Sequence, residues 1–149
     1  MSLAESMKRE NCYYPLEGNT KEEVLKNLVA LFCKSEHLGA ADEEEILKSI
    51  LEREKLSSTG LENGVAIPHA KLGRFKKPVV IIAVSEHPVD FDAQDKKPVS
   101  VFFMVLGSAE NPSDHVQVLS QIARLTKNDM LIKLIKAVKS RDELISLLF

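Results

Sequence analysis

Residues 99–106 read VSVFFMVL, an apolar run with one polar member, Ser100. β-branched and aromatic residues favour extended structure, so this run predicts a β-strand. It is far shorter than the roughly 20 apolar residues that a membrane-spanning helix needs. Because polar residues do not alternate with apolar ones, both faces of the strand are expected to be buried, as they are in a sheet that is covered on both sides.

Two more apolar runs, at residues 65–67 and 79–84, predict strands of the same kind. Amphipathic segments, several of them opened by a capping residue, predict helices on either side of these strands. The expected caps include Thr20, Asp42, Ser113 and Ser140. The predicted helices cover residues 20–32, 43–54, 113–127, 128–138 and 141–148. The pattern therefore indicates an α/β fold.

The composition is that of an ordinary globular protein. The 149 residues suit one domain, and an apolar fraction of 44% with a net charge of -2 argues against disorder. The 20 basic residues are interspersed with 22 acidic ones, so no nucleic-acid partner is expected. The two cysteines, Cys12 and Cys33, form neither a CxxC pair nor a zinc-binding spacing.

The first residues of the chain and its longest apolar runs indicate the expected cellular location of the protein. No charged and then apolar signal segment opens the chain, and no run is long enough to span a bilayer, so a cytoplasmic protein is expected. We expect one domain over residues 1–149. Residues 1–6 are expected to be a cloning remnant or to be disordered.

Two of the four histidines stand in an unusual context. His69 is expected to end the core strand that begins at Val65, directly after Pro68, and His115 lies in the first turn of a predicted helix. Histidine has an ordinary pKa of about 6.5, which suits a base, a nucleophile or a ligand near neutral pH. His37 lies at a helix exit and His87 in a turn between strands, so both are expected to face solvent.

The residue pattern alone leaves the role of His115 open. A helix start offers unpaired N–H groups that suit a bound phosphate, but an exposed first-turn histidine without a ligand has the same sequence pattern. Zinc is disfavoured because two histidines lack a third ligand. A serine hydrolase is disfavoured because the chain has no GxSxG motif, and Ser57, Ser58 and Thr59 are better read as anion-binding hydroxyls.

Five ordered motifs resemble one protein family. They are RE at residues 53–54, STG at 58–60, NGVAIPHAK at 63–71, FDAQDKKPV at 91–99 and DHVQVLSQIA at 114–123. Together they resemble the enzyme IIA domain of the fructose/mannitol family of the bacterial phosphotransferase system, which includes nitrogen-regulatory members. The resemblance covers nearly the whole chain. It departs from the family at Glu62 and Ala70, where glycine is common.

The resemblance implies a fold and a site. The fold would be a single α/β domain with a central mixed β-sheet flanked by helices on both faces. His69 would accept a phosphoryl group on Nε2 from an HPr-like phosphocarrier. His115 would be the second active-site histidine and Arg53 the guanidinium near the phosphate, with no metal ion or other cofactor. We expect the phosphoryl group to be bound by Ser58, Thr59 and Asn63.

The resemblance also implies two candidate functions. The first is a phosphohistidine carrier that passes the group from His69 to a cysteine of a IIB partner for sugar uptake. The second is a regulatory module of the nitrogen-regulatory type, whose phosphorylation state controls its binding to a target protein. Either protein would meet a membrane only indirectly, through a transporter.

Overall fold

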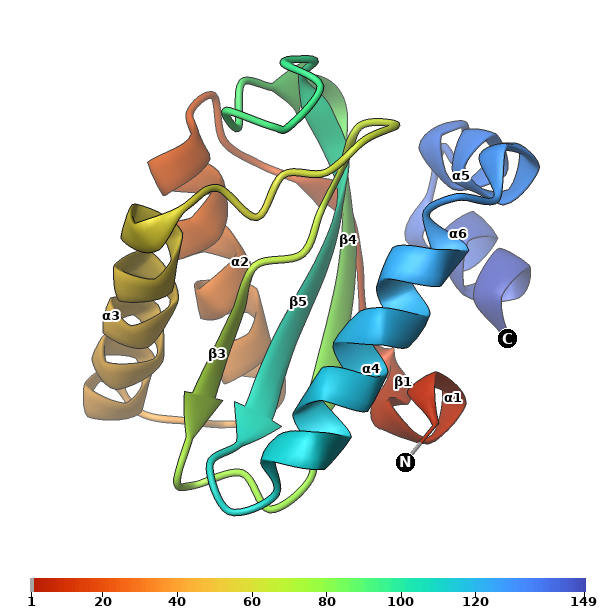
Figure 1. The fold of residues 1–149 in the computed structure, drawn as a ribbon. Helices are drawn as coiled ribbons and strands as arrows, with labels where there is room; N and C mark the ends of the chain where they lie inside the picture. The colour runs from red at the N-terminus through yellow and green to blue at the C-terminus, as the bar shows by residue number, and fades with distance from the viewer. Residues whose placement is uncertain (1) are drawn as a thin grey trace.

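The computed structural model describes residues 2–149, which form one α/β domain (Figure 1). Within this range no helix is long and apolar enough to cross a membrane. The helices are α1 (Leu3–Ser6), α2 (Lys21–Ser35), α3 (Ala40–Leu56), α4 (Pro112–Leu125), α5 (Asp129–Lys136) and α6 (Arg141–Leu148). The strands are β1 (Met7–Leu16), β2 (Val65–Ala66), β3 (His69–Leu72), β4 (Val79–Val89) and β5 (Val99–Ser108).

The strands form a mixed sheet, as the sequence predicts. The order is β1-β4-β5-β2, and β3 pairs with the same edge of β5 that β2 uses. β4 and β5 are antiparallel, whereas β1 runs parallel to β4, and β2 and β3 run parallel to β5. The predicted run at residues 99–106 is thus the strand beside which both β2 and β3 are aligned.

Helices cover both faces of the sheet, which confirms the predicted layers (Figure 1). α2 and α3 pack on one face through buried side chains such as Phe32 and Ile46. α1, α4, α5 and α6 pack on the other face through Val118, Ile132 and Leu144, among others. Each face of β5 is therefore buried under helices, and this explains why its apolar residues do not alternate with polar ones.

The helix boundaries confirm some predicted caps and correct others. The hydroxyls of Thr20 and Ser140 accept N–H hydrogen bonds from the residues three positions on, as expected. α3, however, begins at Ala40, earlier than predicted. Asp42 is therefore its third residue rather than its cap, and the carboxylate of Asp42 accepts the N–H of Gly39. α4 begins at Pro112, with Asn111 rather than Ser113 before it, since proline is favourable at the first helical position.

Two strands and one helix were not predicted. β1 is an edge strand that carries exposed polar residues such as Lys8 and Arg9, and β3 is only four residues long. The expectation for residues 1–6 is corrected in part. Met1 lies outside the described residues, but Leu3–Ser6 forms α1, where Leu3 is buried and its N–H donates to Oε1 of Gln121 at 2.7 Å.

Candidate functional site

His69 is the first residue of β3, and this corrects the prediction that it ends a strand. Pro68, which has no N–H to give to the sheet, separates β2 from β3. The chain stays beside β5 across this break, because the carbonyl oxygen of Pro68 accepts the N–H of Val105 at 2.9 Å. The histidine is thereby placed on the edge strand of the sheet, where its side chain is half-buried.

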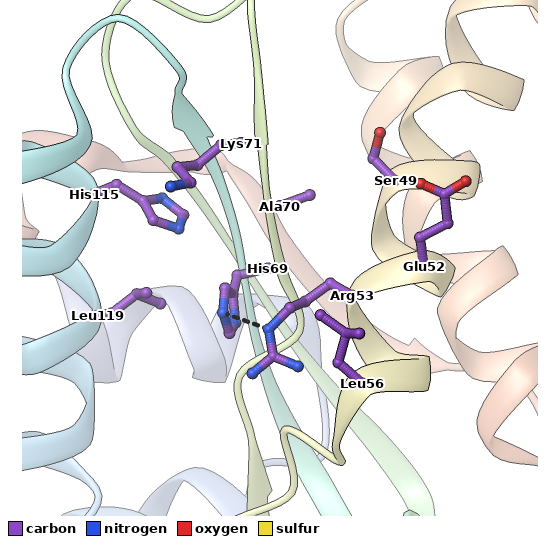
Figure 2. A pocket seen from close by; sticks show the side chains of 9 residues that line it. All are labelled: Ser49, Glu52, Arg53, Leu56, His69, Ala70, Lys71, His115 and Leu119. Atoms are coloured by element: carbon purple, nitrogen blue, oxygen red, sulfur yellow. Dashed lines mark hydrogen bonds between the residues drawn. The ribbon is translucent and has the colours of Figure 1, made fainter.

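Two hydrogen bonds fix the tautomer of the His69 ring. Nδ1 lies 2.8 Å from the carbonyl oxygen of Ile67, which can only accept, so Nδ1 carries the proton. Nε2 then keeps its lone pair, and it accepts the Nε–H of Arg53 at 3.2 Å (Figure 2). The resulting neutral ring presents Nε2 to any group that enters the site.

The surroundings of His69 keep its ring neutral at pH 7. Burial is the largest cause, and it lowers the pKa of His69 below its ordinary value. The hydrogen bond to Ile67 acts in the opposite direction, while the positive charges of Arg53 and Lys71 lower the pKa further. A neutral imidazole is the nucleophilic form, so these effects favour reaction at Nε2.

Arg53 reaches His69 from the last turn of α3. Its Nη1 donates to the carbonyl oxygen of Ser57 at 3.0 Å while its Nε–H bonds His69. The guanidinium is therefore held at two points. A fixed planar fork of N–H donors is suited to binding carboxylate or phosphate oxygens.

His115 is buried, which corrects the alternative of an exposed first-turn residue. Its side chain is 3% exposed, and its ring centroid lies 5.7 Å from that of His69. Gly107 of β5 makes this possible, because a Cβ at Gly107 would lie 1.8 Å from Nδ1 of His115. Any other residue at position 107 would displace the His115 ring or the strand.

The protonation of His115 is determined by its burial. Burial is the largest cause, followed by the electrostatic effects of the neighbouring His69 and Lys71, and together they lower the pKa of His115 to about 4. Among the described residues its Nδ1 has no hydrogen-bond partner. A proton on Nδ1 would have no acceptor, so we assign the proton of the neutral ring to Nε2. His115 is thus a hydrogen-bond donor beside the acceptor nitrogen of His69.

Lys71 belongs to the same site, although it was not predicted. It lies two residues after His69 in β3, so both side chains project from the same face of the strand. Figure 2 shows its ammonium group directed toward the His115 ring. The alternation of side chains along a strand would have identified Lys71 if β3 had been predicted.

The two histidines and their cationic neighbours line one open pocket of about 630 Å³ between α3 and α4, at the β3 edge of the sheet (Figure 2). Two cations and two histidines lie on its walls, and Glu52 is the one acidic residue among those that line it. A pocket of this charge favours an anion. Its lining residues are Ser49, Glu52, Arg53, Leu56, His69, Ala70, Lys71, His115 and Leu119.

The structure does not bring the three predicted phosphoryl ligands to this pocket, and their polar groups bind within the protein. The hydroxyl of Ser58 donates to the carbonyl oxygen of Phe91 at 2.7 Å, and the hydroxyl of Thr59 donates to the carboxylate of Glu54. The amide of Asn63 donates to the carbonyl oxygen of Thr126 and to Asp129, where α4 leads into α5.

His37 and His87 lie apart from the pocket, as expected. His37 is exposed in the turn after α2. His87 lies in β4 rather than in the predicted turn, with its side chain 91% exposed. The four histidines therefore divide into two that share a pocket and two that face solvent.

The protein is thus a small α/β domain in which a neutral histidine lies beside two cations, an arrangement suited to a class of protein that carries an anionic group on histidine. Residues 5–149 match the family described as "Phosphoenolpyruvate-dependent sugar phosphotransferase system, EIIA 2". The chain belongs to this family, as the resemblance of its motifs indicated.

Relatives of both predicted kinds are found. The chain is 33% identical to a nitrogen regulatory protein of Bradyrhizobium diazoefficiens over 89% of this chain and 85% of that one. It is 39% identical to a PTS system fructose-specific EIIA component of Haloferax volcanii, over 79% and 76% of the two chains. The crystal structure of nitrogen regulatory protein IIA-Ntr from Neisseria meningitidis superposes with a TM-score of 0.84 at 29% identity, covering 99% of each chain.

The depressed pKa of His115 predicts a specific loss of stability in acid. In the unfolded chain histidine titrates near 6.5, so between about pH 6.5 and pH 4 the unfolded state binds a proton that folded His115 does not. The stabilisation is complete above pH 6.5 and declines as the pH falls. The full difference corresponds to about 3 kcal/mol. Urea unfolding at pH 7 and pH 4 should show a smaller acid loss in His115→Gln than in the wild type.

His37→Gln is the matched control, because it removes an exposed histidine. It should lose as much stability in acid as the wild type does. Equal acid losses in the wild type and His115→Gln would show that the folded state does not depress the pKa of His115.

Proposed function

We propose that the protein is a phosphohistidine carrier that accepts a phosphoryl group on Nε2 of His69 from an HPr-like phosphocarrier. It then passes the group to a cysteine of a IIB partner, and so to sugar uptake. The observation that carries this proposal is the lone pair on Nε2, which the bond between Nδ1 and Ile67 leaves unprotonated and which accepts the Nε–H of Arg53. We place the protein in the cytoplasm, where it meets a membrane only through a transporter.

The proposed step needs little more than positioning and charge stabilisation. Nε2 of His69 attacks the phosphorus, a new P–N bond forms, and the P–N bond to the donor histidine breaks, leaving its electron pair on the donor ring. The attacking ring gains positive charge, which the carbonyl oxygen of Ile67 stabilises through Nδ1–H. Transfer to a cysteine thiolate reverses this change and returns His69 to its neutral form.

We expect three side chains to meet the charge of the phosphoryl group. That group carries about -1.5 to -2 charge units near pH 7. Arg53 already contacts Nε2 of His69, and moving from the nitrogen to the phosphoryl oxygens needs only a change of side-chain conformation. Lys71 adds a second cation, and His115 adds an Nε2–H donor. Charge-assisted hydrogen bonds of this kind are shorter and stronger than neutral ones.

The rim of the pocket suits a transient protein partner. Leu56 is 81% exposed beside Arg53, and Leu119 lines the opposite wall of the pocket on α4. Val116 lies one turn away from Leu119 and is also exposed. Exposed apolar side chains beside the pocket suit contact with a partner protein, because apolar groups form the buried core of protein interfaces.

A nitrogen-regulatory role is the second candidate. The relatives from Bradyrhizobium diazoefficiens and Neisseria meningitidis are nitrogen regulatory proteins, and they match this chain over most of their own lengths. In such a role His69 would still be phosphorylated, and the bound phosphate would change the affinity of the pocket rim for a regulatory target protein. The two roles share the first transfer step and differ in whether the phosphoryl group then leaves His69 for a IIB cysteine.

Incubation with a phosphorylated HPr-like donor tests the first step. Wild-type protein should incorporate one acid-labile phosphate, and His69→Ala should incorporate none because the nucleophile is gone. His87→Ala, which removes an exposed histidine far from the pocket, should label normally. Labelling of His69→Ala at the wild-type level would overturn the assignment.

His115→Ala should slow the transfer without removing the acceptor. The loss of one donor to a charged transition state typically lowers the rate about a hundredfold. Stopped-flow measurement of the transfer to His69 gives this rate, and circular dichroism shows whether the variant is folded. A folded His115→Ala protein with a near-normal rate would show that His115 does not take part in the transfer.

A further inference from the structure

We infer that Glu54 is a positioning residue for phosphoryl transfer: its carboxylate holds the turn at residues 57–59, and this turn sets Arg53 against Nε2 of His69. The inference rests on the proposed function, because it concerns the same reaction. Glu54 is not among the residues that line the pocket, so it cannot act by touching the phosphoryl group. It acts through hydrogen bonds to the turn.

The carboxylate of Glu54 is buried and fully engaged. It accepts the backbone N–H of Thr59 at 3.1 Å, the hydroxyl of Thr59 and, at 2.7 Å, the ammonium of Lys21 from α2. A buried charge is unfavourable unless it is paired and hydrogen-bonded, and both conditions are met here. Glu54 is therefore held firmly, and the turn that it binds is held with it.

One side of this turn supports Arg53. α3 ends at Leu56, the chain turns at Ser57, and Thr59 comes back to bond Glu54. The carbonyl oxygen of Ser57 accepts Nη1 of Arg53 at 3.0 Å. Ser57 is exposed, so burial does not fix its carbonyl group. The bonds that Thr59, two residues later, makes to Glu54 limit the movement of this carbonyl group instead.

The other side of the same turn supports His69. The carbonyl oxygen of Thr59 accepts the N–H of Ile67 at 3.0 Å. The carbonyl oxygen of Ile67 in turn accepts Nδ1–H of His69 at 2.8 Å. Arg53 and His69 come from different elements, yet both are positioned relative to the residues that Glu54 holds.

A second set of contacts fixes the turn against the loop after β4. The carbonyl oxygen of Phe91 accepts the Ser58 hydroxyl at 2.7 Å and the Lys21 ammonium at 3.4 Å. The same ammonium lies 4.5 Å from the centre of the Phe91 ring. Ser58 and Thr59 thus serve the turn, which gives their hydroxyls a role other than the predicted binding of phosphate.

If Glu54 acted only on stability, or only through its charge, its replacement would give different experimental results. If Glu54 only stabilised the fold, its loss would lower the melting temperature and leave the Arg53 contact intact in the folded protein. If it acted only by charge, it would alter the pKa of His69, on which Arg53, Glu54 and Lys71 all act, without freeing Arg53. Solvent exchange of the Arg53 Nε–H separates these cases, because this proton is the one bonded to His69.

Glu54→Gln is the test variant, since it keeps the shape of the side chain and removes its charge. In the unphosphorylated protein, NMR should show the Arg53 Nε–H exchanging about tenfold faster as the turn opens more often. Transfer from a phosphorylated HPr-like donor should slow by about ten- to a hundredfold, the usual effect of a misplaced group. Glu44→Gln, on the exposed side of α3, is the matched control and should change neither quantity more than about twofold.

Thr59→Val keeps the test decisive if Glu54→Gln does not fold. It removes the hydroxyl bond alone and should change both quantities in the same direction by a smaller factor. Unchanged Arg53 exchange in a folded variant would overturn the inference, and slower transfer with unchanged exchange would assign Glu54 a charge effect instead. If the wild type takes no phosphate, the proposed function fails, while the exchange measurement still decides whether Glu54 positions Arg53.

Discussion

The hydrogen bond between Nδ1 of His69 and the carbonyl oxygen of Ile67 is the interaction on which the chemistry of the site depends. It leaves the lone pair on Nε2, and it is made across Pro68, in the short break between β2 and β3. The apolar strand β5 holds both short strands in place on either side of this break. A change that moved Ile67 would free the ring to exchange its proton between the two nitrogens.

In the proposed function, the pocket combines groups that have opposite roles toward one bound phosphoryl group. His69 offers a lone pair, while His115, buried against Gly107, offers an N–H. Arg53 and Lys71 lower the pKa of His69, and Lys71 also lowers that of His115. The same positive charges would stabilise a phosphoryl group once it arrived. The cations therefore favour the reactive neutral histidine before transfer and the charged product after it.

The sequence predicted those features that depend on the spacing of residues close together in the chain. The caps at Thr20 and Ser140, the apolar run that became β5 and the layered α/β fold were all visible in residue spacing. β1 was missed because an edge strand with exposed charged residues lacks the apolar pattern of a central strand. Without β3, nothing identified Lys71 as a neighbour of His69.

The sequence motifs predicted some of the residues that line the pocket, but not the contacts that fix them there. His69, His115 and Arg53 do meet in one pocket. The burial of His115 could not be predicted, because it depends on the absence of a side chain at Gly107, on another element. The hydroxyls of Ser58 and Thr59 could bind an anion or the protein itself, and only the position of Phe91 and Glu54 in the fold decides between these partners.

In the proposed mechanism, the hydrogen bond from Nδ1 of His69 to the carbonyl oxygen of Ile67 leaves Nε2 unprotonated, so that Nε2 is the atom that takes the phosphoryl group. Nitrogen-15 and phosphorus-31 NMR of the phosphorylated protein is the decisive measurement, because coupling to phosphorus identifies the nitrogen that carries the group. The mechanism predicts phosphorus on Nε2 of His69, with Nδ1 still protonated and hydrogen-bonded. Phosphorus on Nδ1 of His69, or on either nitrogen of His115, would contradict it.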